Sequence, residues 1–517
     1  MEVDAIMARG KDASFYHFKS IELMPDIPHL KVPDYKTLSK EFRKTFADQK
    51  SGILRYSENG HPVFGAYLQS NSNEMVTWGI LAVGEWLCSN NTDWIAPTYP
   101  DFYDKNHGIY LNSPQKTKIE YWYLFYVNTL AGAVLRTLYV KNSQAVLRMG
   151  SSADSLFSLA QRIDYNFNDQ GYDFKMGKPF THRDIFRQPD SIAGYAYNML
   201  FAALQAGRSE YLAESKKAIH RYENFSHNPW YEIPNGSAGV LASSWLNAHG
   251  FPTDVKKAAG FVFDHEEGPL QIGCWGKEAI NGLMMGWRGE SRQYALSSAY
   301  SMETLMPMQF LLPSVKYCPP LADAVAKYML NALSSFQLFF AKGTEPLYET
   351  KAELNAAIPY EKLEKIRDGH MPAACGDFWG HRSVYGAGYL SWLDALVTET
   401  TDSNIYAYDL SITDWLAERV YPVYLLRNPY GKAINVSFFP SDIWENKCPE
   451  LYKGNHLQDV CLWNMQNKQI LSENAEKLSV TLVEGEAVII ALLPKGVKPE
   501  KKGKMICAGN VELCAEF

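Results

Sequence analysis

The sequence of 517 residues predicts a mainly α-helical protein: an (α/α) toroid of helical hairpins, followed by a C-terminal antiparallel β-domain. Three observations support this prediction. Apolar residues recur at helical spacing through most of residues 71–415, short β-branched runs fill residues 416–517, and the helical runs are joined by connections of two very different lengths. We therefore expect a mixed N-terminal segment over 1–70, the toroid over 71–415 and the β-domain over 416–517.

The N-terminal segment has two predicted short strands, in "ILRYSENGHPVFGAYL", on either side of a polar turn. A first helical run begins near residue 35. Several of the later runs begin with Ser, Thr or Asp in a capping position and end at Gly or Asn. These runs include "NEMVTWGILAVGEWLC", "TKIEYWYLFYVNTLAGAVLRTLYV", "SADSLFSLAQRI", "DSIAGYAYNMLFAALQAG", "SEYLAESKKAIHRYENF", "SAGVLASSWLNAHG", "TDVKKAAGFVF", "ESRQYALSSAYSMETLMPMQFLL", "LADAVAKYMLNALSSFQLFFAKG" and "RSVYGAGYLSWLDALVTET".

The C-terminal part has a different texture. Short runs such as "YPVYLLRNPY", "KAINVSFFP", "DVCLWNMQ" and "KLSVTLVEGEAVIIALLP" are rich in β-branched residues and separated by turn residues, as in antiparallel strands. Helical runs followed by strand runs indicate separate layers or separate domains.

The connections between helices predict where a site lies. Sequential helix pairs can close into a ring in which each hairpin buries its apolar face against its neighbours. Some connections are short, but those over 164–189, 226–236, 264–289 and 367–382 are long and rich in polar and aromatic residues. Because binding residues concentrate on loops held by a rigid scaffold, we expect one functional face of the ring.

Composition excludes several functions. The net charge is −7 and no long basic run exists, so binding of nucleic acid through a basic patch is not expected. No apolar run reaches the length of a membrane span, and the N-terminus has no signal-peptide pattern. The 8 cysteines include no CxxC pair, which predicts reduced thiols, a cytoplasmic location, no disulfide and no bound metal.

The order of helices and strands resembles carbohydrate-active enzymes that join an α/α toroid to an antiparallel β-domain, among them glycoside hydrolases and polysaccharide lyases. The resemblance is one of architecture and covers most of the chain. It implies a glycan substrate, and the aromatic fraction of 14% agrees with a surface that stacks on sugar rings. It implies no cofactor.

The stretch "ACGDFWGHRSVYG" is the first candidate site. Asp377 and His381 offer acid–base groups, Arg382 offers an anion clamp, and Trp379 and Tyr385 offer stacking surfaces, all at the start of a helix. A simpler interpretation is that Asp377 caps that helix and pairs with Arg382.

The stretch "DHEEGPLQIGCWGKEAINGLMMGWRGE" is the second candidate. Glu278 near Trp275 is a carboxyl group beside an apolar ring, a setting that raises the pKa of a general acid. A solvated loop whose tryptophans cover helix ends explains the stretch equally well.

Two further long loops carry candidates. The loop over 164–191 ends in Arg187, Gln188 and Asp190 directly before a helix, where an Asp is also a common N-cap. The stretch "SHNPWYEIPNGS" places Trp230, Tyr231, Glu232 and Asn235 where they could line a sugar subsite.

We predict a glycoside hydrolase that acts on a short, uronic-acid-containing oligosaccharide through paired carboxyl groups. The catalytic candidates are Asp377, Glu278, Asp190 and His381, and the candidates for substrate binding are Trp379, Arg382, Tyr385, Trp275, Arg187, Gln188 and Trp230. A polysaccharide lyase, with His381 or Tyr385 as base, is an alternative that the sequence leaves open. A non-catalytic glycan-binding protein is a third.

Overall fold

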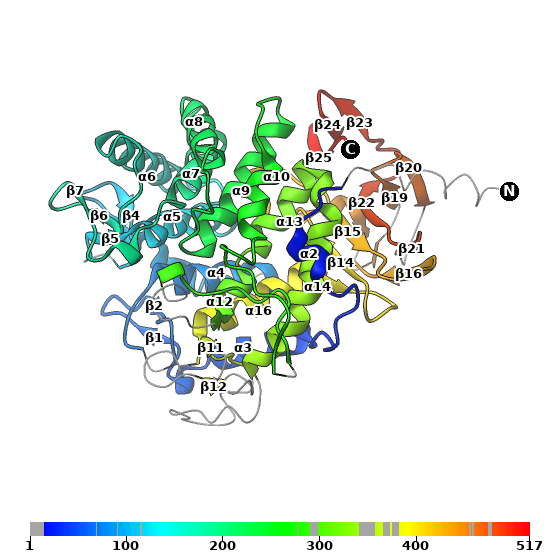
Figure 1. Cartoon of the computed structure of the whole chain (residues 1–517), viewed down its shortest axis with the longest axis horizontal. Coiled ribbons are helices and arrows are strands. Elements are labelled where there is room, and N and C mark those ends of the chain that lie inside the picture. The colour runs from blue at the N-terminus through cyan, green and yellow to red at the C-terminus, as the bar shows by residue number, and fades with distance from the viewer. Residues whose placement is uncertain are drawn as a thin grey trace.

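The structure is a computed structural model that describes residues 15–68, 70–89, 91–113, 116–276, 278–289, 298–340, 357–364, 373–374, 382–453, 456–457, 460–473 and 478–517. Helices make up most of the chain up to residue 396, and strands gather in the C-terminal part, on the right of Figure 1. The helix-rich and strand-rich regions that the sequence predicts are therefore both present.

One set of helices is buried on all sides. Nearly all of their residues are buried, because other elements cover every face of each helix. They are α4 (Met75–Cys88), α5 (Tyr121–Thr137), α7 (Ser191–Gln205), α9 (Ile233–Ala248), α12 (Ser301–Leu305), α13 (Met308–Tyr317) and α16 (Val384–Leu396).

A second set is amphipathic and buries a single face. In α3, for example, Phe42 and Phe46 are buried on the face that carries Ser39, and Asp34 caps the helix by accepting the N–H of Thr37 at 2.9 Å. This set comprises α3 (Tyr35–Ala47), α6 (Ser143–Arg162), α8 (Tyr211–Glu223) and α10 (Val255–Val262). α14 (Ala322–Phe336) is also almost fully buried and packs on α12 and α13, whereas α2 (Lys19–Leu23) and α17 (Trp444–Lys447) are short.

The buried helices contact one another in a closed circuit. α4 packs on α5, α5 on α7, α7 on α9 and α9 on α13. α13 follows α12 directly in the chain, α12 packs on α16, and α16 packs on α4 again. The amphipathic helices lie against this circuit, α3 on α16, α6 and α8 on α7, and α10 on α9. Helices distant in sequence are thus brought side by side, as α4, α12 and α16 are in Figure 1.

Short antiparallel strands lie between the helices. They are β1 (Arg55–Tyr56) with β2 (Pro62–Val63), β3 (Tyr103–Asp104) with β4 (Ile109–Tyr110), β5 (Lys118–Glu120) with β6 (Gly171–Asp173) and β7 (Lys178–Phe180), β8 (Cys274–Trp275) with β9 (Glu278–Ala279), and β10 (Ser298–Tyr300) with β11 (Lys362–Glu364) and β12 (Ala373–Ala374). β5 and β10 run directly into α5 and α12, so segments that the sequence presents as the starts of helices are strands.

The C-terminal strands form an antiparallel sheet of six strands and several smaller ones. The sheet has the order β13 (Val397–Glu399), β14 (Tyr406–Asp409), β15 (Val423–Arg427), β22 (Ala487–Pro494), β19 (Val460–Asn464) and β20 (Gln469–Glu473). The smaller groups are β16 (Ile434–Phe438) with β21 (Leu478–Leu482), β17 (Tyr452–Lys453) with β18 (His456–Leu457), and β23 (Glu500–Lys502), β24 (Met505–Ala508) and β25 (Val511–Ala515). Its first two strands precede residue 416, so the strand-rich region starts at Val397.

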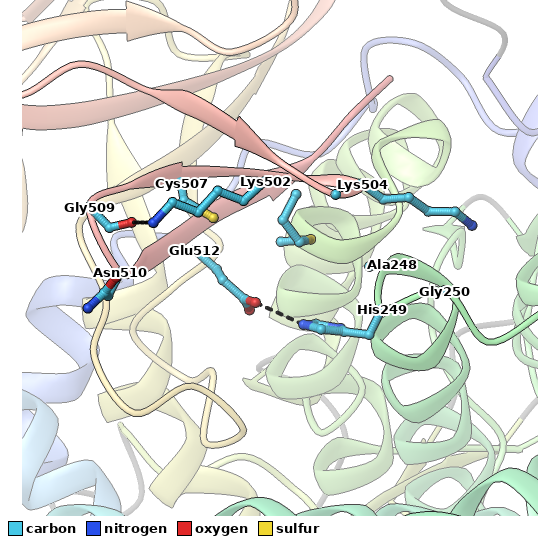
Figure 2. Close-up of a pocket in the computed structure, with 11 residues that line it drawn as sticks. Ala248, His249, Gly250, Lys502, Lys504, Cys507, Gly509, Asn510 and Glu512 are labelled. Carbon is cyan, nitrogen blue, oxygen red and sulfur yellow. Dashed lines mark hydrogen bonds and ion pairs between the residues drawn. The ribbon is translucent and has the colours of Figure 1, made fainter.

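Charged contacts join the strand-rich region to the helices. Lys316 of α13 and Asp414 form a fully buried ion pair with the Lys316 Nζ 2.6 Å from a carboxylate oxygen. His249, just beyond α9, lies 2.8 Å from the carboxylate of Glu512 on β25. Figure 2 shows this second contact beside a pocket of about 520 Å³ between α9 and the last strands.

In the described part of the chain, no helix has both the length and the apolar character needed to cross a bilayer.

Candidate active site

Asp377, Trp379 and His381, the centre of the first candidate stretch, lie outside the described residues. Its last two candidates are described. The guanidinium of Arg382 lies 3.7 Å from the ring centroid of Tyr360 and donates to the carbonyl of Ile358 at 2.9 Å and to the hydroxyl of Tyr360 at 3.0 Å. Arg382 thereby holds the segment that leads into Glu361.

Tyr385 lies in the first turn of α16 and belongs to a buried hydrogen-bonded group. Its hydroxyl donates to Glu361 Oε1 at 2.9 Å and lies 3.1 Å from the hydroxyl of Tyr67. The other carboxylate oxygen of Glu361 accepts from the hydroxyl of Ser301 at 3.1 Å. Burial raises the pKa of Glu361 to about 7, although hydroxyl donors, from Ser383, Tyr385 and Ser301, oppose this rise.

Acidic residues stand directly before four of the buried helices. Glu74 precedes α4, Glu120 precedes α5, Asp190 precedes α7 and Glu232 precedes α9, and none of them caps its own helix through its side chain. The amides at a helix N-terminus carry partial positive charge, which favours an acid at this position. The starts of α7 and α9 contact each other directly, because the side chain of Asp190 accepts the backbone N–H of Tyr231 at 3.0 Å.

Glu232 is the most strongly perturbed of these acids. Its side chain is buried, and burial raises its pKa well above 4.5. The negative charges of other carboxyl groups raise it further, and the largest contributions come from Glu303, Glu120, Asp190 and Glu361, in that order. Glu303 lies in α12, Glu120 and Asp190 precede α5 and α7, and Glu361 precedes β11, so these carboxyl groups come from separate parts of the fold. We call Glu120, Asp190, Glu232, Glu303 and Glu361 the carboxyl cluster.

Glu303 is central to the carboxyl cluster. It lies in α12, is 5% exposed, and contributes the largest charge effect on the pKa of Glu232. Its charge also raises the pKa of tyrosines on two sides. On one side are Tyr67 and Tyr385, near Glu361. On the other side are Tyr126 and Tyr389, whose hydroxyls are hydrogen-bonded to each other and both accept from the side-chain amide of Gln309.

Two glutamine side chains hold Glu120. Gln170 and Gln188 each donate an amide hydrogen to a different oxygen of its carboxylate, both at 3.0 Å. The carbonyl oxygen of Gln188 accepts the N–H of Trp122 at 2.8 Å, which orients the amide. Burial raises the pKa of Glu120, while the two amides oppose the rise by stabilising its charged form. Of the predicted binding residues, Gln188 is thus brought to the carboxyl cluster.

Asp190 belongs to the carboxyl cluster in an unexpected way. It occupies the N-cap position of α7 but makes no capping hydrogen bond there. Instead its Oδ2 accepts the backbone N–H of Tyr231, at 3.0 Å, at the start of α9. Burial raises the pKa of Asp190 to about 7.

The remaining predicted residues take part in local contacts. Trp275 and Glu278 pair across the β8–β9 hairpin, with Trp275 buried and Glu278 partly exposed. Arg187 forms ion pairs with Asp169, at 3.3 Å, and Asp184, at 3.1 Å.

The indole of Trp230 is buried at the start of the segment that leads into Glu232. The next residue, Tyr231, has its ring centroid 6.1 Å from that of Trp287. Aromatic rings thus adjoin the carboxyl cluster at Tyr231.

The sequence pattern leaves three members of the carboxyl cluster unmarked. Glu120 follows "KI" in a run that resembles a helix, Glu303 lies within an apolar run, and Glu361 comes from a segment with no helical or strand periodicity. An acid immediately before a fully apolar helix, as in "KIEYWYL" and "NEMVTWG", is the signal that could have identified the positions at helix starts.

Within the described ranges, no three His, Cys, Asp or Glu side chains are grouped closely enough to hold a metal ion. What the carboxyl cluster offers chemically is proton transfer. Burial and the charges of the other four acids favour the protonated form of Glu232, which is the state that a proton donor needs.

The sequence matches no family model and no curated protein. Several solved structures are similar to this chain. A sugar epimerase from a ruminal bacterium has 10% identity and a TM-score of 0.43, with 68% of this chain and 97% of that one covered. The cellobiose 2-epimerase from Spirochaeta thermophila has 8% identity and a TM-score of 0.42, with 70% and 96% covered.

A GH127 β-L-arabinofuranosidase from Geobacillus stearothermophilus T6 has 10% identity and a TM-score of 0.38, with 91% of this chain and 79% of that one covered. The names of all three describe enzymes that act on carbohydrates. Because each TM-score is below 0.5, the reaction of this chain has to be argued from the carboxyl cluster itself.

Proposed function

We propose that this protein is a glycoside hydrolase in which two members of the carboxyl cluster, Glu232 and Glu303, cleave the glycosidic bond. The observation that supports this is the position of Glu232, buried and surrounded by four carboxyl groups from separate elements. Glycosidases commonly use one protonated and one ionised carboxyl group on opposite sides of the scissile bond.

The two roles follow from the charges. Burial and the charges of its neighbours raise the pKa of Glu232 well above 4.5, which favours the protonated form, so we assign Glu232 the role of proton donor to the leaving oxygen. Glu303 exerts the largest charge effect on Glu232, which makes it the natural ionised partner, either as base or as nucleophile. Glu361, held by Tyr385 and Ser301, orients the substrate's hydroxyl groups beside this pair.

We propose an (α/α) toroid as the scaffold. The closed circuit of contacts from α4 through α16 and back supports an inner ring, and the amphipathic helices packed against it support an outer one. In such a ring the starts of α5, α7 and α9 face the same side, which explains how Glu120, Asp190 and Glu232 reach one another.

The sugar bound beside Glu232 is proposed to be neutral. A uronate carboxylate placed there would add a further negative charge beside Glu232, whose pKa the other carboxyl groups already raise. A uronic acid elsewhere along an oligosaccharide remains compatible with the proposal.

The lyase alternative has one observation in its favour, the hydroxyl of Tyr385 between Tyr67 and Glu361. A lyase base would have to lose that proton. Burial, and then the charge of Glu361, raise the pKa of Tyr385 well above 10, so this tyrosine is a better donor than base.

The test is turnover of neutral and uronate-containing oligosaccharides by the wild-type protein and by E232Q and E303Q. We expect new reducing ends from the wild-type protein and losses of roughly 10²-fold or more in each variant. The matched control is E223Q, because Glu223 is also a buried glutamate, 8% exposed like Glu232, that accepts from a hydroxyl outside the carboxyl cluster.

Three results would contradict the proposal. The first is ultraviolet-absorbing unsaturated products, which indicate a lyase. The second is rearranged sugars with no new reducing ends, and the third is glycan binding with no product at all.

A further inference from the structure

The segment Tyr231–Glu232 is clamped from two sides. Where it enters α9, Asp190 Oδ2 accepts the N–H of Tyr231 at 3.0 Å. The carbonyl of Tyr231 accepts the backbone N–H of Arg288 at 3.0 Å. The N–H of Glu232, on the same peptide as that carbonyl, is turned toward the Asp190 carboxyl and lowers its pKa. The segment is therefore held at both the N–H and the carbonyl of Tyr231, directly before Glu232.

The carboxyl group of Asp190 is buried and uses one of its two oxygens for the hydrogen bond to Tyr231. The residue is 1% exposed, and its Oδ1 has no hydrogen-bond partner in the part of the chain that is described. An acid whose task is to cap α7 would accept from the first turn of α7, and Asp190 does not. Its contacts run to the neighbouring helix instead.

The helices that carry the two acids are tightly docked. Asn235 in the first turn of α9 donates to the hydroxyl of Ser191, the first residue of α7, at 3.1 Å. A Cβ atom at Gly194 would come within 2.1 Å of the side-chain oxygen of Asn235. These contacts restrict how the starts of α7 and α9 can move relative to each other. The hydrogen bond from the Tyr231 N–H to Asp190 is therefore held in place.

From this geometry we propose that Asp190 is a positioning residue: its carboxylate holds the segment that carries Glu232 and places a negative charge at the start of α9. The expected effect on turnover rests on the proposed function, whereas the expected effect on the titration of Glu232 does not. It replaces the acid–base role that the sequence suggests for Asp190.

Asp190 faces the charge of Arg288 and lies near Tyr222, whose pKa its charge raises. Glu232 faces Glu303, Glu120 and Glu361 as well as Asp190. Removing the Asp190 charge removes one of several negative neighbours, so a partial change in the proton affinity of Glu232 is expected.

The test uses the full chain and D190N. An asparagine can still accept the N–H of Tyr231 through its side-chain oxygen but carries no charge. Isotope-edited infrared spectroscopy measures the protonation of glutamate side chains as a function of pH. The band of Glu232 is assigned as the one that is present in the wild-type protein and absent from E232Q. We expect D190N to raise the acid dissociation constant of Glu232 about tenfold, which moves its midpoint to lower pH.

The control is D409N. Asp409 is equally buried, also has a pKa of about 7 because of burial, and also accepts backbone N–H groups, from Ser411 at 2.8 Å and Ile412 at 2.9 Å. It lies in β14, and D409N is expected to leave the Glu232 midpoint unchanged.

In a turnover assay, D190N should lower kcat at neutral pH, leave KM nearly unchanged and shift the pH profile of kcat toward acid. D190S, which keeps a smaller acceptor, should shift the midpoint in the same direction, and it replaces D190N if that variant does not fold. An unchanged Glu232 midpoint in the folded variant overturns the inference, even if melting is affected. A shifted midpoint in a protein without glycosidase activity supports the inference and refutes only the proposed function.

Discussion

Replacing Glu361 by Gln should remove a pH dependence from the stability of the fold. Burial raises the pKa of Glu361 from 4.5 to about 7 in the folded protein. Between these two pH values the unfolded chain gives up a proton that the folded protein retains. The free energy of unfolding therefore falls as the pH rises through this window and levels off above it.

The magnitude follows from the two pKa values. Because each pKa unit corresponds to 1.36 kcal/mol, the change from 4.5 to about 7 amounts to roughly 3 kcal/mol. A glutamine cannot titrate, so E361Q lacks this contribution at every pH. The free energy of unfolding of E361Q, taken relative to wild type, should thus rise by roughly 3 kcal/mol from pH 4.5 to pH 7.

Urea denaturation at a series of pH values measures this difference. The surface variant E58Q serves as control, because Glu58 lies in an exposed turn. Acids outside the carboxyl cluster with raised pKa values, such as Asp409, contribute equally to both proteins and cancel. A difference between E361Q and wild type that stays constant with pH would refute the reasoning, because it would place the pKa of Glu361 near its ordinary value.

Three further predictions concern side chains that support the carboxyl cluster or the fold. Y385F removes a donor to Glu361, so the pKa of Glu361 should rise above its present value of about 7, by one to two units if the bond is worth about 1.5–3 kcal/mol, and infrared titration of that carboxyl checks it. Q188L removes one of the two amide donors to Glu120, so the pKa of Glu120 should rise and turnover should fall. The double variant with E120Q should lose no more turnover than E120Q alone, because both changes act through the same carboxyl group. K316M leaves the carboxylate of Asp414 buried without its cation and should lower the free energy of unfolding, measured by urea denaturation, by about 3–5 kcal/mol. Replacing Asp414 by an apolar residue in the same variant should recover much of that loss.

The helices could be predicted because burial imposes a period on their sequences. The runs that form α4, α7 and α9 are apolar at every turn, and the protein buries them on all sides, as the pattern requires. The strands β5 and β10 could not be separated from the helices they precede. They are three residues each, too short to show an alternating pattern, and their pairing partners lie far away in the sequence.

The site was harder to predict because its members meet only in the folded chain. Glu361 lies in a segment without periodicity, and it becomes notable only through contacts to Ser301 and Tyr385. Gln188 and Asp190 were identified from a long loop before a helix, but their roles depend on Glu120 and on the start of α9. A sequence shows which residues stand at helix starts, whereas the approach of those starts depends on the circuit of helices.

The sharpest test of the central claim is the response of E232Q and E303Q to leaving-group chemistry. In a dinitrophenyl glycoside the dinitrophenolate leaves without being protonated, whereas the leaving sugar of a natural oligosaccharide needs the proton of the general acid. If Glu232 is that acid, E232Q should lose roughly 10²-fold or more on the oligosaccharide but retain most of its turnover on the aryl glycoside, and E303Q should lose turnover on both. Equal losses of E232Q on the two substrates, or full activity of either variant on the oligosaccharide, would contradict the assignment.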